Sequence, residues 1–134
     1  MFGRKSRDTI DSLIGGSTSI EGNLRFRGGL RLDGQIKGNL IGEPGESSML
    51  VISEQARVEG EVRAAHLIVN GQIVGPVYAA EMLELQPNAR ITGDVHYKAL
   101  EMHGGAQVSG KLTHEPNEEP LLKLAAASAP SRPG

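Results

Sequence analysis

Aliphatic and polar residues alternate in short stretches through the middle of the chain, and these stretches recur. The recurring unit is aliphatic-x-Gly-x-aliphatic, and its first residues lie 16, 22, 15, 18 and 17 positions apart. The six copies begin at Ile20, Ile36, Val58, Ile73, Ile91 and Val108. A shorter unit with an aliphatic residue at each end lies between copies, as in Leu30-Arg31-Leu32. Because no stripe of helical period is sustained in this zone, the alternation predicts short β-strands.

A repeat of about 17 residues built from short strands predicts a β-solenoid. Each repeat forms one winding of about three strands, and its inward aliphatic side chains stack on those of the neighbouring windings, about 4.8 Å away. The repeat glycine lies either at the middle of a strand or at a bend. Aromatic residues make up 3% of the chain, which fits a narrow aliphatic interior. We therefore expect an all-β, single-domain solenoid of about six windings over residues 18–114.

The segments that flank the repeats differ from them in composition. We expect residues 1–17 to form a flexible N-terminal head. Residues 115–134 hold four of the seven prolines and end in Ala, Ser, Pro and Gly, so we expect a disordered tail. The long interval between the second and third repeats contains a turn-rich segment, 42–48, which we expect to loop out.

A solenoid without caps presents unpaired strand edges and an apolar cross-section at each end. We find no amphipathic helix at either border of the repeats that is long enough to act as a cap. We therefore predict a homopolymer that assembles end to end. The predicted contact residues, from the first and last windings, are Ile20, Leu24, Phe26, Met102, Val108 and Leu112. In the alternative, the flanking tails fold over the ends and the protein stays monomeric.

Composition and motifs argue against several kinds of site. A formal net charge of −2 disfavours a nucleic-acid partner, and the absence of Cys excludes disulfides, thiolate metal sites and Cys nucleophiles. The four histidines (His66, His96, His103 and His114) stand at different offsets from their repeat glycines, so we expect no metal site. No G-x-x-x-x-G-K-[ST] phosphate loop is present. We expect no catalytic residues, no cofactor and no nucleotide.

The outward carboxylates Asp33, Glu59, Glu61, Asp94 and Glu101 are interpreted as solubilising charges that guard exposed β surface. No apolar run approaches the roughly 20 residues of a transmembrane helix, and the basic N-terminus lacks the apolar region of a secretory signal. These features predict a cytoplasmic protein.

Several segments together resemble the bactofilin family. They are Met1-Phe2-x-x-Lys5, Leu13-Ile14-Gly15 and the run from Ile20-x-Gly22-x-Leu24-x-Phe26 through Asp33-Gly34-x-Ile36-x-Gly38. The resemblance covers about residues 1–114. It implies a right-handed parallel β-helix that assembles without nucleotide into non-polar filaments. It also implies a bacterial cytoskeletal scaffold, peripheral to the inner membrane, that maintains cell shape and localises cell-wall enzymes.

One feature departs from the family pattern. Members often carry an aromatic residue near the terminal winding that supports polymer contacts. Here the last aromatic residue is Tyr97, one winding earlier.

The resemblance also implies that the head contacts the membrane through Met1, Phe2 and Lys5, and the neighbouring Arg4 adds a basic residue to this membrane-targeting segment. One Phe buried in the bilayer interface contributes about 1.5–3 kcal/mol, and each basic residue near anionic lipid adds about 1 kcal/mol. Such binding is marginal for one head, but a filament displays many heads at once. We therefore expect membrane binding to depend on polymerisation.

Two alternatives come from other classes of protein. A hexapeptide-type β-helix enzyme requires an aliphatic residue every six positions, and the repeat intervals are not multiples of six. A non-polymerising β-helix adaptor would dock a partner on one flat face, with Leu121–Leu124 of the tail as a docking peptide.

Overall fold

The computed structural model describes residues 10–45 and 47–115. Within these ranges the chain forms sixteen strands and no helix, which confirms the all-β prediction. The first nine strands are β1 (Ser12–Ile14), β2 (Ser19–Glu21), β3 (Leu24–Phe26), β4 (Gly29–Leu32), β5 (Gln35–Lys37), β6 (Leu40–Gly42), β7 (Met49–Ile52), β8 (Arg57–Glu59) and β9 (Val62–Val69). The other seven are β10 (Gln72–Val74), β11 (Val77–Leu85), β12 (Arg90–Thr92), β13 (Val95–Tyr97), β14 (Leu100–Met102), β15 (Gln107–Ser109) and β16 (Leu112–His114).

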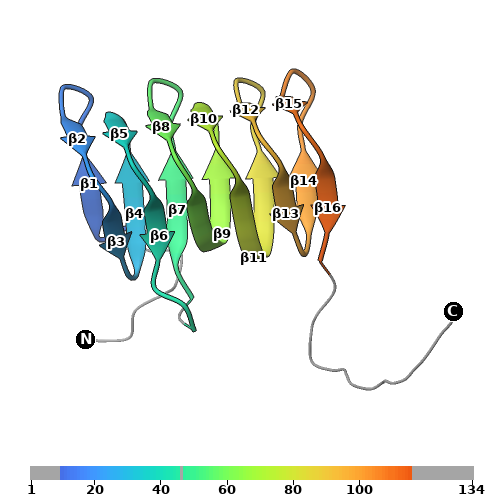
Figure 1. Ribbon diagram of the computed structural model, residues 1–134, viewed down its shortest axis with the longest axis horizontal. Helices are drawn as coiled ribbons and strands as arrows, with labels where there is room; N and C mark the ends of the chain where they lie inside the picture. The colour runs from blue at the N-terminus through green and yellow to red at the C-terminus, as the bar shows by residue number, and fades with distance from the viewer. Residues whose placement is uncertain (1–9, 46, 116–134) are drawn as a thin grey trace, which may run out of the picture.

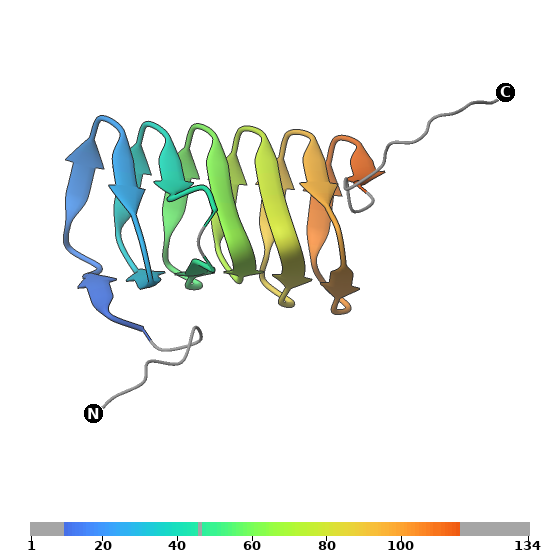
Figure 2. The ribbon, with the colours of Figure 1, turned by 90° about the horizontal axis from the view of Figure 1, so that it is seen from below.

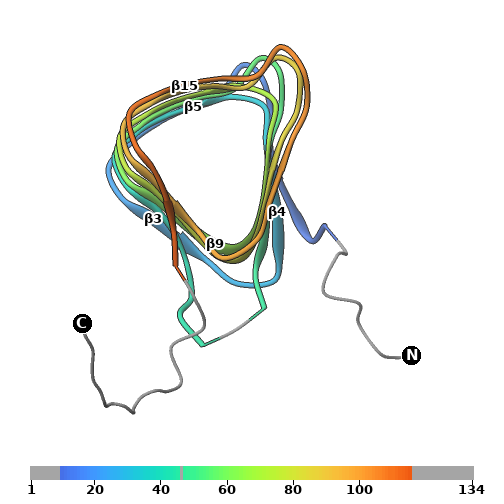
Figure 3. The same cartoon turned by 90° about the vertical axis from the view of Figure 1, so that its right-hand side faces the viewer.

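The strands wind into a solenoid with a triangular cross-section (Figures 1 and 3). Face A consists of β1, β4, β7, the second half of β9, the second half of β11 and β14. Face B consists of β2, β5, β8, β10, β12 and β15. Face C consists of β3, β6, the first half of β9, the first half of β11, β13 and β16. Each face thus receives one strand segment from each of six windings, as predicted.

Every pairing between successive windings is parallel. Seen from the C-terminal end, the chain passes from face A over face B to face C as it advances toward the viewer, so the solenoid is right-handed (Figure 3). The long strands β9 and β11 continue around the corner from face C to face A. Their pairing shifts register at this corner, between Ala79 and Met82.

Inward aliphatic side chains form columns that run along the solenoid axis. On face B the column contains Ile36, Val58, Ile73 and Ile91, which lie opposite one another in successive strands and are almost fully buried. The core is made almost entirely of Leu, Ile, Val and Ala, as the sequence predicted. Each winding therefore buries its apolar side chains against the windings on both sides of it.

The repeat glycines lie at the bend between faces B and C, which decides between the two positions that the sequence left open. Gly75 and Gly93 have φ values of 145° and 148°, a region that L side chains rarely adopt. A Cβ at Gly75 would lie 2.3 Å from the carbonyl oxygen of Gly60, and one at Gly93 would lie 2.4 Å from that of Gly75. The bend therefore requires glycine both for its backbone angle and for the close approach of the next winding.

The long interval between repeats forms a loop between β6 and β7, at the corner between faces C and A (Figure 3). Ser48, at the end of this loop, is buried. Its hydroxyl accepts a hydrogen bond from the backbone N–H of Ala65 at 2.9 Å, and its carbonyl oxygen accepts one from the N–H of His66 at 2.9 Å. The loop is thus anchored to the corner of β9, where the third winding passes into the fourth, and the strands on both sides of the loop keep their register.

Strand β1 lies within residues 1–17, the segment expected to form a flexible head. It pairs with β4 over three residues, so the first winding begins at Ser12. Ile14 points inward and packs against the core, in register with Leu32. The described chain therefore has a complete first winding of β1, β2 and β3.

Candidate functional site: the open ends of the solenoid

Each end of the solenoid presents three strands that are paired on one side only (Figure 2). At the N-terminal end these strands are β1, β2 and β3, whose partners are β4, β5 and β6. At the C-terminal end they are β14, β15 and β16, whose partners are β11, β12 and β13. Within the described ranges no other segment pairs with their free edges. Unpaired edges of this kind template the addition of further strands.

The C-terminal end exposes side chains that are buried at every equivalent position further inside. Leu112 is 43% exposed, whereas Val95, its register partner one winding earlier, is 0% exposed. Met102 is 45% exposed, and its partner Leu85 is 0% exposed. Val108 is half-buried. These three predicted contact residues therefore lie together on the terminal winding, with apolar surface facing the end.

The N-terminal end holds the other three predicted contact residues. Ile20 lies on β2, and Leu24 and Phe26 lie on β3; all three are half-buried and pack on the core from the outermost winding. Two further apolar residues near this end are more exposed, namely Ile10 at 39% and Leu13 at 62%. Sequence reasoning missed both, because it treated this segment as part of the head.

Several outward carboxylates on the solenoid lie beside an arginine. The Nε atom of Arg31 donates a hydrogen bond to Asp33 at 2.9 Å, and that of Arg57 donates one to Glu59 at 2.8 Å. The Ser53 hydroxyl and Arg31 lower the pKa of Asp33, and the hydrogen bond from Arg57 lowers the pKa of Glu59. These side chains are therefore ionised and paired near neutral pH.

The outside of face C carries a ladder of stacked side chains. The guanidinium carbon of Arg63 lies 3.9 Å from the centre of the Tyr78 ring, and the rings of Tyr78 and His96 are nearly parallel, with centroids 4.6 Å apart. A carboxylate oxygen of Glu115 lies 2.9 Å from Nδ1 of His96. The ladder borders a hollow of about 570 Å³ beside the β6–β7 loop. Its contacts tie successive windings together on the outer surface.

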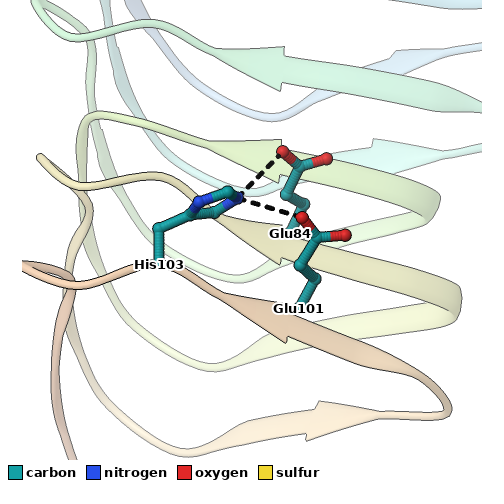
Figure 4. Close-up of side chains that lie close together, drawn as sticks. All are labelled: Glu84, Glu101 and His103. Atoms are coloured by element: carbon teal, nitrogen blue, oxygen red, sulfur yellow. Dashed lines mark ion pairs between the residues drawn. The ribbon is translucent and has the colours of Figure 1, made fainter.

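A second cluster joins the last two windings on face A. Glu84 on β11 and Glu101 on β14 lie opposite each other in register, and His103 follows directly after β14 (Figure 4). The Nε2 atom of His103 lies 3.4 Å from Glu84 Oε2 and 3.1 Å from Glu101 Oε2. We expected no metal site, because the histidines stand at different offsets from their repeat glycines and the chain has no Cys. The signal that could have revealed the cluster is the spacing of 17 between Glu84 and Glu101, one full repeat.

The predicted membrane-contact residues Met1, Phe2, Arg4 and Lys5 lie outside the described residues, so their role stays a prediction. In the part of the chain that is described, no helix has the length and apolar character needed to cross a bilayer.

The parallel windings, the aliphatic interior and the two ends with unpaired strand edges define an uncapped β-solenoid. The chain belongs to the bactofilin family, described as polymer-forming cytoskeletal, and the match covers residues 12–113. This confirms the resemblance that the sequence motifs indicated. No curated protein and no solved structure matches the chain.

Proposed function

We propose that this protein is a scaffold whose subunits join end to end through the open ends of the solenoid, without nucleotide, into non-polar filaments. The observation that carries the proposal is the exposure of Leu112, in a column where Val95 is fully buried. A further copy on the terminal winding would bury this side chain and pair the free edges of β14, β15 and β16. Membership in a polymer-forming family supports the same conclusion.

Two contributions to the free energy favour an assembled subunit over an isolated one. Complete burial of a Leu or Met side chain contributes about 1.5–3 kcal/mol relative to leaving it exposed, and Leu112 and Met102 are each little more than half-buried. Each backbone hydrogen bond gained at a strand edge adds about 0.5–1.5 kcal/mol. Both contributions increase with the surface that is buried when the three terminal strands of one subunit contact another subunit.

Assembly is tested by electron microscopy and sedimentation of the purified full-length chain, in buffer that contains no nucleotide. The parent should form filaments. Leu112→Arg and Leu24→Glu should each abolish them, because a charge without a partner would be buried at the junction. Thr113→Arg is the matched control, since Thr113 points outward on the same strand as Leu112 and should leave assembly intact.

Two results would overturn this part of the proposal. One is a parent protein that stays monomeric at high concentration, as expected if the tails cover the ends or the protein is a non-polymerising adaptor. The other is full-length filaments from both charged variants.

We further propose that the filaments lie on the cytoplasmic face of the inner membrane and bind it through the N-terminal head. Phe2→Ser should release filaments from anionic vesicles, because the apolar contact of each head is lost. Leu112→Arg should also reduce binding, because single heads lack avidity. Co-sedimentation with vesicles measures both effects, with neutral vesicles as the control. Unchanged co-sedimentation of Phe2→Ser would contradict the role of the head.

As a scaffold, the filament would maintain cell shape by localising cell-wall enzymes. This proposal rests on family membership, and it assigns the protein a structural rather than a catalytic role. A pull-down with the intact chain and with a chain that lacks residues 115–134 would show whether the tail recruits such partners. Equal recovery of partners by both chains would place recruitment on the solenoid faces instead.

A further inference from the structure

Two carboxylates and one imidazole converge on the outside of face A, at the junction of the fifth and sixth windings (Figure 4). One ligand atom from each of Glu84, Glu101 and His103 can be chosen such that all three lie within 4.8 Å of one another. The backbone holds this arrangement firmly, because Glu84 and Glu101 are register partners and the N–H of His103 donates to the carbonyl oxygen of Leu85 at 2.9 Å. The Gln86 side chain also donates a hydrogen bond to Glu84.

The charge environment of this pair differs from that of the other outward carboxylates. Asp33 and Glu59 are each paired with an arginine on their own strand or turn. Among the described residues, the ion pairs of Glu84 and Glu101 are made only with His103. Like charges directly opposite each other on neighbouring strands are destabilising. The cluster therefore has two negative charges and at most one positive charge.

The imidazole supplies an independent observation. Its Nε2 atom is shielded from solvent and has no hydrogen-bond partner, although it points at two carboxylate oxygens. Both contacts, 3.1 Å and 3.4 Å, lack hydrogen-bond geometry. A neutral imidazole in this position would aim its Nε2 lone pair at two carboxylate oxygens, an arrangement that becomes favourable when a cation lies between them.

Two of the three distances in the cluster match those between the ligands of a single small cation. Zn²⁺ binds imidazole nitrogen and carboxylate oxygen at about 2.0–2.2 Å, so two such ligands on a tetrahedral ion lie about 3.3 Å apart. His103 Nε2 lies 3.1 Å and 3.4 Å from its two neighbours. An ion beside these atoms would neutralise both carboxylates and give Nε2 the partner that it lacks.

We propose that Glu84, Glu101 and His103 form a binding site for a divalent transition-metal ion, with Zn²⁺ as the best-fitting ion. Three protein ligands leave a coordination position for water. Gln86 acts as a positioning residue, since its hydrogen bond orients the Glu84 carboxylate. The bound ion would link β11 to β14 and so hold the terminal winding to the one beneath it.

The test is a titration of the full-length, chelator-treated protein with Zn²⁺ alone, in competition with a chromophoric chelator. The parent should bind one ion per chain, and zinc should raise its midpoint of thermal unfolding. Glu101→Gln and His103→Gln should each weaken binding at least roughly tenfold and remove the thermal shift. Both residues lie at the surface, and circular dichroism checks that the variants remain folded.

Matched controls are Glu59→Gln and His66→Gln, which alter a carboxylate and an imidazole elsewhere on the solenoid and should leave zinc affinity unchanged. Leu112→Arg should also bind zinc like the parent, so a failure of assembly and a failure of metal binding can be told apart. The proposal is overturned if the parent binds no zinc at micromolar concentration. It is also overturned if the cluster variants bind zinc as well as the parent does, which would indicate adventitious binding only.

Discussion

The fifth and sixth windings carry similar aliphatic residues at their inward positions but place them in very different environments. Val95 and Leu112 occupy the same column, as do Leu85 and Met102, and in each pair only the residue of the fifth winding is fully buried. The residue types are equivalent, so the difference arises from position in the stack alone. Burial in this protein is therefore supplied by the neighbouring winding, and the terminal winding is an incomplete structural unit until another surface covers it.

The glycine column shows the same contrast at the other end. A Cβ at Gly38 would meet the carbonyl oxygen of Gly22 at 2.2 Å, whereas one at Gly22 would meet nothing within 4 Å. Gly22 nevertheless has a φ of 126°, so its backbone already has the conformation of the inner bends. The first winding therefore has the backbone conformation that allows another winding to stack on it. Its outer side has no such neighbour in the described chain.

The largest predicted effect is a difference in stability loss between a glycine substitution at an inner bend and one at a terminal bend. Gly93→Ala should destabilise the fold by at least about 4 kcal/mol, because it adds a backbone clash to a positive φ. Gly22→Ala carries only the conformational strain, about 1–3 kcal/mol. Denaturant unfolding of both variants in the non-assembling Leu112→Arg background measures the difference. Equal losses of stability would show that the close approach between windings contributes little.

A smaller effect compares two residues of one core column. Leu85→Ala should cost about 3 kcal/mol of unfolding free energy, because it leaves a cavity between two windings. Met102→Ala should cost about 1 kcal/mol or less in the same non-assembling background, since its side chain is half exposed. In the parent background, Met102→Ala should weaken assembly, measured as a higher critical concentration. An unchanged critical concentration would remove Met102 from the junction.

The smallest effect concerns a polar link between inner windings. Ser53 and Arg31 lower the pKa of Asp33, so this link stabilises the fold above the ordinary carboxyl value of 3.8 and is lost as the pH falls below it. Asp33→Asn should therefore flatten the decline of the thermal midpoint between about pH 5 and pH 2. Asp94→Asn, which alters a carboxylate near the C-terminal end, provides a comparison. An identical acid profile for Asp33→Asn and the parent would contradict the lowered pKa.

The interior of the solenoid could be predicted because each winding repeats the same inward positions. The aliphatic spacing alone placed Ile36, Val58 and Ile73 in one column, and the structure confirms it. The position of the repeat glycine could not be decided, because both a strand centre and a bend tolerate the absence of a Cβ. The close approach of Gly75 to Gly60 becomes visible only when the windings are stacked.

Features that depend on two windings at once were harder to predict. Glu101 was interpreted as a solitary solubilising charge, and His103 was compared with the other histidines by its offset from its repeat glycine. Their proximity to Glu84 follows from a register that the uneven repeat intervals obscure. The segment 1–17 was separated from the repeats by its composition, yet Ser12–Ile14 pairs with β4 and so belongs to the first winding.

The loop between β6 and β7 has a practical consequence for work in living cells. It leaves the solenoid at a corner between the second and third of the six windings. Ser48 binds the end of the loop to β9, so the chain beyond it continues without any change of register. A short epitope or fluorescent label inserted after Gly45 would project sideways and leave both terminal cross-sections unobstructed. The described chain, by contrast, begins beside the first winding and ends beside the last, where the free strand edges lie.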